Sequence, residues 1–160
     1  MNGENRSIKT GVRRCRMPGH VANRLQAALA REVYYLVAEG VVSAADVDTA
    51  LSWGPGLRWG IMGNMMLNHL GGGSGGIEHF FQQFSGPMTA WWKTLGSPVL
   101  TPEVQKKLID SVHAEAGSRT IEELEAERDQ LLLGLLLGLI ELRSKPANAA
   151  PTSQAAAVAS

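Results

Sequence analysis

Four side chains in the first half of the chain have the types and positions to bind or transform a small molecule. Asn23 stands at the start of an apolar helical segment, where an amide can donate and accept hydrogen bonds at once. Arg58 and Trp59 are neighbours in the stretch GPGLRWG, and such a pair is suited to clamping a carboxylate or stacking on a ligand. His69 precedes the glycine-rich run GGGSGG. Each group also has a structural interpretation: a helix cap or turn residue for Asn23, and an arginine packed on an indole at a helix corner for the pair.

Other kinds of site have little support in the sequence. The run GGGSGG, residues 71–76, has no β-strand pattern before it and no Lys after it, so a mobile connector explains it better than a phosphate loop. His69, Glu78 and His79 flank this run, but a metal site needs three or four ligands that converge. We therefore expect no metal site.

The composition argues against a nucleic-acid-binding, membrane or secreted protein. The chain has 160 residues, enough for one domain, and 44% of them are apolar. Fifteen basic residues balance fifteen acidic ones, which gives no electrostatic case for nucleic acid or an anionic membrane. The run LLLGLLLGLI, residues 131–140, is about half the length that spans a bilayer. A single cysteine, Cys15, and an N-terminus without an apolar signal region predict a cytoplasmic protein that does not enter a membrane.

Helical periodicity dominates the chain from residue 21 to about residue 143, and no strand alternation is evident, so we expect an all-α fold. Residues 1–16 form a basic lead-in, residues 17–145 the helical domain, and residues 146–160 a low-complexity tail expected to be disordered. The expected helices are 21–39, a short one from 43 that stops at Gly54-Pro55-Gly56, then 61–70, 77–84, 87–95, 102–116 and 120–143, with Thr101 as one cap and Thr120 with Glu123 as a capping box.

Several of these stretches occur together, in the same order, in one known family. The stretch PGHVANRLQAALAREVYYLVAEGVVSAADVDTAL, followed by GPGLRWGIMG and HLGGGSGG, resembles the C-terminal helical domain of the NAD-dependent 3-hydroxyacyl-CoA dehydrogenases. The nearest branch is that of carnitine 3-dehydrogenase, L-gulonate 3-dehydrogenase and lambda-crystallin. The matching residues are Pro18, Gly19, Asn23, Arg24, Glu32, Glu39, Gly40, Ser43, Asp46, Asp48, Gly54, Gly56, Leu57, Arg58 and Trp59. Gly63-Asn64 departs from the usual Gly-Pro, which makes that corner less rigid.

The resemblance implies a multi-helix domain of the 6-phosphogluconate dehydrogenase C-terminal type, with no Rossmann domain in this chain. It implies NAD as cofactor, bound by a separate domain that also carries the catalytic His-Glu pair, and a small hydroxy acid or an acyl-CoA as substrate, as in fatty acid metabolism. Asn23 is then catalytic, while Arg58, Trp59 and His69 bind substrate. Residues 1–16 become the remnant of an interdomain connection.

Two functions from different classes follow from this resemblance. In the first, the chain is the substrate-binding and dimerisation domain of such a dehydrogenase, a homodimer that is inactive without its cofactor domain. In the second, it is a truncated or repurposed helical module that dimerises or binds partners and catalyses nothing.

Overall fold

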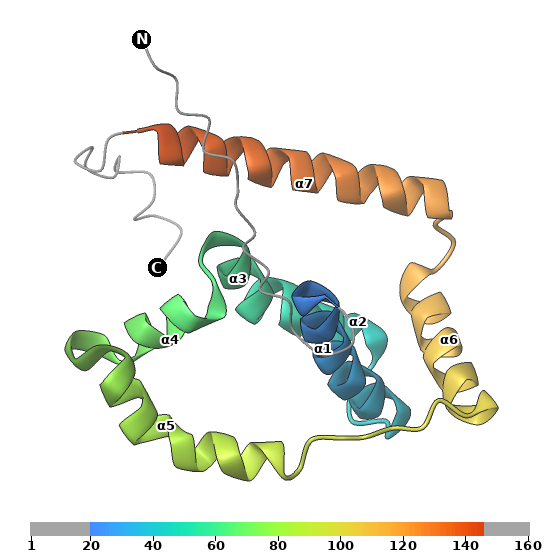
Figure 1. Cartoon of the computed structure of the whole chain (residues 1–160). Coiled ribbons are helices and arrows are strands. Elements are labelled where there is room, and N and C mark those ends of the chain that lie inside the picture. The colour runs from blue at the N-terminus through green and yellow to red at the C-terminus, as the bar shows by residue number, and fades with distance from the viewer. Residues whose placement is uncertain (1–19, 146–160) are drawn as a thin grey trace.

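The computed structural model describes residues 20–145, so the expected lead-in and tail lie outside the described residues. Every regular element within this range is helical, which confirms the all-α expectation (Figure 1). The elements are α1 (Val21–Ala38), α2 (Ala44–Leu51), a π-helix η1 (Ser52–Gly56), α3 (Leu57–Ile61), α4 (Asn64–Gly71), a 3₁₀ turn η2 (Gly73–Gly75), α5 (Gly76–Trp92), α6 (Pro102–Ala116) and α7 (Ile121–Ser144).

The helix starts that the sequence predicts are formed by side-chain caps. The Ser43 hydroxyl accepts from the Asp46 N–H at 3.1 Å and so begins α2. Thr120 and Glu123 form the reciprocal capping box of α7: the Glu123 N–H donates to Thr120 Oγ1 and the Thr120 N–H donates to Glu123 Oε2. Gly40, with φ of 72°, follows the end of α1 as expected. Local hydrogen bonding therefore sets these boundaries.

The expected breaks in the middle of the chain are only partly correct. The Gly54-Pro55-Gly56 stretch does not stop the helix, because the backbone continues as η1 into α3 and changes direction at Gly54, where φ is −91° and ψ is −113°. The expected helix 61–70 is wrong at its start. Met62 is extended and Gly63 caps a new helix, so residue 61 ends α3 and α4 begins at Asn64.

The two short helices expected at 77–84 and 87–95 are instead one helix, α5, with Pro87 inside it. A proline removes one backbone N–H, and the glycine before it, Gly86, has no Cβ to meet the ring. The hydroxyls of Ser85 and Thr89 donate to backbone carbonyl groups one turn earlier, at 2.6 and 2.7 Å. The glycine run is also not an open connector, since it folds into the tight turn η2 between α4 and α5.

Helix α6 fastens the corner between α1 and α2. The Lys107 ammonium donates to the Ala38 carbonyl at the end of α1, at 3.0 Å, and the Ala44 N–H at the start of α2 donates to Ser111 Oγ at 2.9 Å. Lys107 and Ser111 are one helical turn apart, so a single face of α6 satisfies both helix ends. Ala38 and Ala44 are the two buried apolar residues in the described part of the chain.

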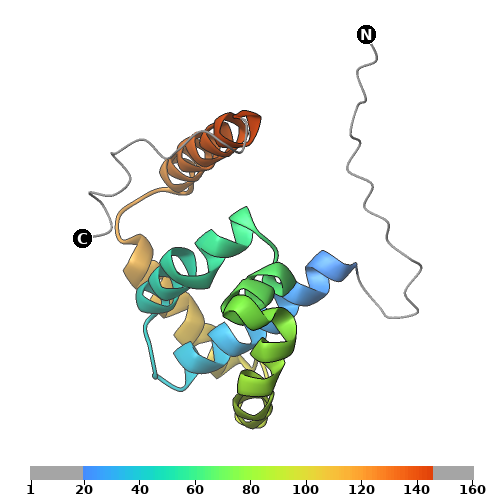
Figure 2. The ribbon, with the colours of Figure 1, turned by 90° about the vertical axis from the view of Figure 1, so that its left-hand side faces the viewer.

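Helix α7 stands apart from the other helices in both views (Figures 1 and 2). It packs closely along none of the described helices, and Arg143 donates to the Ile61 carbonyl at 3.0 Å. Most of its large apolar side chains are exposed. A helix of this composition is normally covered, so the described fold leaves apolar surface for another molecule or domain.

Candidate substrate site

Asn23 lies in the first turn of α1, with its side chain exposed. The N-cap position of this helix is held by His20, whose side chain makes no capping hydrogen bond, so Asn23 is not at the capping position. No hydrogen bond within residues 20–145 uses the Asn23 amide. Its donor and acceptor atoms are available to a ligand or to a group from another domain.

Arg58 and Trp59 lie on the short helix α3, just after the kink at Gly54. Both side chains are exposed, and Trp59 retains 41% of its accessible surface. The ring contacts in the described range, which join Phe80 to Phe81 and to Phe84, do not involve Trp59. The pair is therefore presented to solvent on the η1–α3 corner.

His69, in the last turn of α4, holds the glycine turn. Its Nδ1 accepts from the Ile77 N–H at 3.1 Å, which requires an unprotonated Nδ1. A Cβ on Gly76, where φ is 61°, would meet the His69 ring, so only glycine allows this approach. In the neutral tautomer that this bond selects, Nε2 carries the proton and can donate to a second group.

His79 holds the other side of the same turn. Its Nδ1 lies 2.9 Å from the Gly72 carbonyl oxygen and therefore donates to it, and its Nε2 lies 3.1 Å from the Gln83 amide nitrogen. The two histidines thus close a turn that the sequence analysis interpreted as a mobile connector. Within residues 20–145 no three His, Cys, Asp or Glu side chains are grouped as a metal would need.

The four predicted site residues come from three helices. Arg58 and Trp59 share α3, which packs on α4 and so on the helix that carries His69. Asn23 is on α1, which packs on α2 and α6. No hydrogen bond in the described range joins any two of the four. The arrangement is two exposed sets of polar groups, not a closed pocket.

Comparison with known proteins shows which family the domain that carries these residues resembles. Residues 19–113 match the family model described as the C-terminal domain of 3-hydroxyacyl-CoA dehydrogenase. The chain belongs to this family. A protein of Oceanobacillus iheyensis named L-carnitine dehydrogenase is 38% identical over 133 residues, which are 83% of this chain and 43% of that protein. L-carnitine dehydrogenases of a Pseudomonas species and of Bacillus cereus are 41% and 36% identical, over 75% and 74% of this chain and 37% and 36% of their own lengths.

The chain thus spans about two fifths of the length of the curated relatives it matches. The part that matches the dehydrogenase family model ends at His113 and so includes α1 to most of α6, while α7 lies beyond it. No helix among residues 20–145 is both long enough and apolar enough to cross a membrane.

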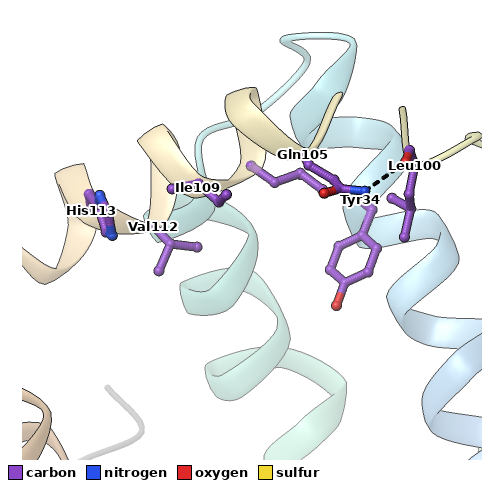
Figure 3. A pocket seen from close by; sticks show the side chains of 7 residues that line it. Tyr34, Leu100, Gln105, Ile109, Val112 and His113 are labelled. Atoms are coloured by element: carbon purple, nitrogen blue, oxygen red, sulfur yellow. Dashed lines mark hydrogen bonds between the residues drawn. The ribbon is translucent and has the colours of Figure 1, made fainter. Parts of the chain in front are cut away.

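Within this dehydrogenase domain an open groove joins α1 to α6, and the sequence analysis did not predict it. One hollow of this groove, about 390 Å³, is lined mostly by apolar residues, and Gln105 donates to the Leu100 carbonyl at its rim (Figure 3). The lining residues are Tyr34, Leu100, Gln105, Leu108, Ile109, Val112 and His113. The signal was present, since Leu108, Ile109 and Val112 are spaced for one helix face, but within residues 20–145 no other segment fully covers that face.

The sequence also did not reveal the hydrogen bond made by Glu32, one of the residues that match the family pattern. Its carboxylate accepts from the Gly96 N–H at 2.7 Å and so ties the segment after α5 to the middle of α1. A Cβ on the buried Gly96 would overlap the Tyr35 ring, which explains a glycine here. Glu32 therefore shapes the fold and does not face the candidate site residues.

Proposed function

We propose that this chain is the substrate-side domain of an NAD-dependent dehydrogenase that oxidises carnitine or a similar 3-hydroxy acid. The observation that carries the proposal is the Asn23 amide at the exposed start of α1, which has no hydrogen-bond partner among residues 20–145, in a chain whose relatives are named L-carnitine dehydrogenase. The amide holds the substrate oxygen, or the group that removes its proton, by hydrogen bonds.

Arg58 and Trp59 fit the two ends of such a substrate. A guanidinium binds a carboxylate through paired hydrogen bonds, and an indole face attracts a quaternary ammonium. These chemistries stand on adjacent residues of α3. His69, on the next helix α4, would add an Nε2–H donor, since its Nδ1 is occupied by the Ile77 N–H. The substrate that this set favours is a zwitterionic or carboxylate-bearing hydroxy acid.

The residues described do not fit a dinucleotide. A nucleotide fold places its glycine-rich turn between a strand and a helix, whereas residues 71–76 lie between helices α4 and α5, and no strand occurs in residues 20–145. NAD would be held by another domain or chain. No step of hydride transfer is assigned to the groups of this chain, and the chain alone is inactive.

Complementation tests this function. The purified chain is assayed for NAD reduction with carnitine, alone and mixed with the separately expressed N-terminal part of a carnitine dehydrogenase relative. We expect no activity alone and measurable activity in the mixture. Asn23→Ala lowers kcat at least tenfold in the mixture, whereas Asn64→Ala, an exposed amide at the start of α4, leaves it unchanged. Activity of the chain alone, or equal effects of the two variants, would overturn the proposal.

The second candidate is a helical module that pairs with another copy and catalyses nothing. The exposed apolar surface of α7 favours pairing in either case. A mixture that stays inactive although the N-terminal part binds the chain would select this candidate.

A further inference from the structure

Two exposed surfaces of this chain complement each other in shape, apolar character and charge. The first is the leucine segment of α7, whose exposed fractions range from 47% to 66% and whose side chains point to most sides of the helix. Its large members are Leu131, Leu132, Leu133, Leu135, Leu136, Leu137, Ile140 and Leu142. A helix that is apolar over most of its circumference needs a groove and not a flat surface to cover it.

The second surface is the groove between α1 and α6. Three hollows share lining residues and so form one surface, from Arg31 on α1, past Tyr34 at the corner, to Ile109 and Val112 on α6. Figure 3 shows the part of this surface between Tyr34 and His113. Small alanine side chains line its α1 end. One end of the α1–α6 groove is therefore basic and shallow, and the other is apolar.

Charge is ordered along α7 in the same way. The first half of the helix carries five carboxylates and one arginine, and the second half is the leucine segment, with Glu141 and Arg143 near its end. The charged residues of the first half are Glu122, Glu123, Glu125, Glu127, Arg128 and Asp129. An acidic half followed by an apolar half complements a groove with a basic end and an apolar end.

If the chain's own α7 folded back into the groove, its acidic and apolar halves would each lie beside the end of the groove that does not complement them. Helix α7 follows α6 after residues 117–120, so folding back would place its acidic half beside Val112 and its leucine segment towards Arg31. A helix from a second copy is not tied to this connection and can enter in the opposite direction. The leucine segment then meets Ile109 and Val112, and the carboxylates meet Arg31.

We infer that two copies of the chain exchange α7, each placing this helix in the α1–α6 groove of the other. The inference rests on the dimerisation that the proposed function includes, and it names the surfaces that form the dimer. About half of the eight large side chains can face the groove, and at roughly 100 Å² each they bury about 400 Å²; with a similar area of the groove covered, each partner buries about 800 Å², the amount typical of a stable complex. The exchange is reciprocal, so the pair has a two-fold axis and leaves no unpaired groove.

Sedimentation velocity over a dilution series, on the full chain, measures the association. Ile109→Glu in the groove and Leu136→Glu on α7 should each weaken the dimer at least tenfold, while Val41→Glu, a change at another exposed apolar residue outside both surfaces, should not. Circular dichroism checks that each variant remains helical. Arg31→Glu and Glu125→Arg should each weaken the dimer, and the double variant should recover most of the loss because the charges are exchanged.

Disulfide trapping identifies the occupant of the groove. In a Cys15→Ser background, a chain with Ile109→Cys is mixed with a chain with Leu136→Cys and oxidised. A crosslinked heterodimer is expected, and a chain carrying both cysteines should give covalent dimers. A disulfide within one chain would overturn the exchange and show that α7 folds back on itself.

The outcomes separate this inference from the proposals it rests on. A chain that stays monomeric at all concentrations overturns both dimerisation and exchange. A dimer that none of the groove or α7 variants weakens overturns the exchange alone. Neither result bears on the complementation assay, which tests the dehydrogenase function independently.

Discussion

The carboxylate of Glu32 and the backbone N–H of Gly96, 64 residues apart in the chain, are joined by a hydrogen bond of 2.7 Å. This bond ties the middle of α1 to the segment that leads from α5 into α6. Both residues are partly or fully shielded from solvent, and the Tyr35 ring lies against Gly96. Glu32 thereby fixes where the α5–α6 connection crosses the helix that carries Asn23.

Replacing Glu32 by Ala should destabilise the chain by about 1.5–3 kcal/mol, because the Gly96 N–H loses a charged acceptor. Glu32→Gln should lose less, since the amide oxygen still accepts. Urea unfolding followed by circular dichroism measures both. Glu39→Ala, at the exposed end of the same helix, is the control. Equal losses for the Glu32 and Glu39 alanine variants would contradict the role given to this bond.

His69 should tolerate Asn better than Ala. The Asn carbonyl oxygen can replace Nδ1 as the acceptor for the Ile77 N–H, whereas Ala leaves that donor and the space beside Gly76 unfilled. We expect His69→Ala to cost about 1 kcal/mol more than His69→Asn, measured as the difference in urea midpoint. If the two variants unfold alike, His69 does not hold the turn.

The two bonds from α6 to the α1–α2 corner should act together. Lys107→Met removes the donor to the Ala38 carbonyl, and Ser111→Ala removes the acceptor for the Ala44 N–H. Each should cost about 1 kcal/mol, and the double variant less than the sum, since one loosened corner loses both bonds. Lys106→Met, whose ammonium pairs with Asp110 on the exposed side of α6, is the matched control and should change the stability little. Strict additivity would show that the two bonds are independent.

The start of α7 should weaken in acid. Its own backbone N–H and the Thr120 hydroxyl lower the pKa of Glu122 from the ordinary value of 4.5. A carboxyl whose pKa is lowered by folding stabilises the folded form above its unfolded pKa, and this contribution is lost as pH falls through the folded pKa. Helicity should therefore decline below about pH 4.5, and Glu122→Gln should reduce the decline seen by circular dichroism. A pH profile identical in the variant would assign the loss to other carboxylates, such as Glu103, whose pKa the Thr101 hydroxyl lowers at the start of α6.

The sequence predicts what local chemistry decides. Ser43, Thr101 and Thr120 mark helix starts because each hydroxyl satisfies an N–H in its own first turn, and the structure confirms all three. Pro87 was misleading because the preceding residue, Gly86, has no Cβ to meet the proline ring, so α5 continues through the proline.

What the sequence does not predict depends on residues far apart. The bonds of Glu32 to Gly96 and of Lys107 to Ala38 span 64 and 69 residues, and no spacing rule connects such pairs. The glycine run folds into a fixed turn because His69 and His79 hydrogen-bond to its backbone, and the sequence alone does not show these bonds. The candidate site residues were identified by resemblance, and the functional roles of Asn23, Arg58, Trp59 and His69 stay predictions.

The scarcity of buried apolar side chains has a thermal consequence. In the described part of the chain, Ala38 and Ala44 are the buried apolar residues. The heat capacity change of unfolding follows the apolar area that becomes exposed, so a separate chain should have a small one for its length, with a shallow temperature dependence of stability. In the proposed exchange, two chains cover each other's leucines, which adds that area and sharpens the transition. Dilution should then broaden the calorimetric peak as well as lower its midpoint, which makes cooperative melting a property of the pair.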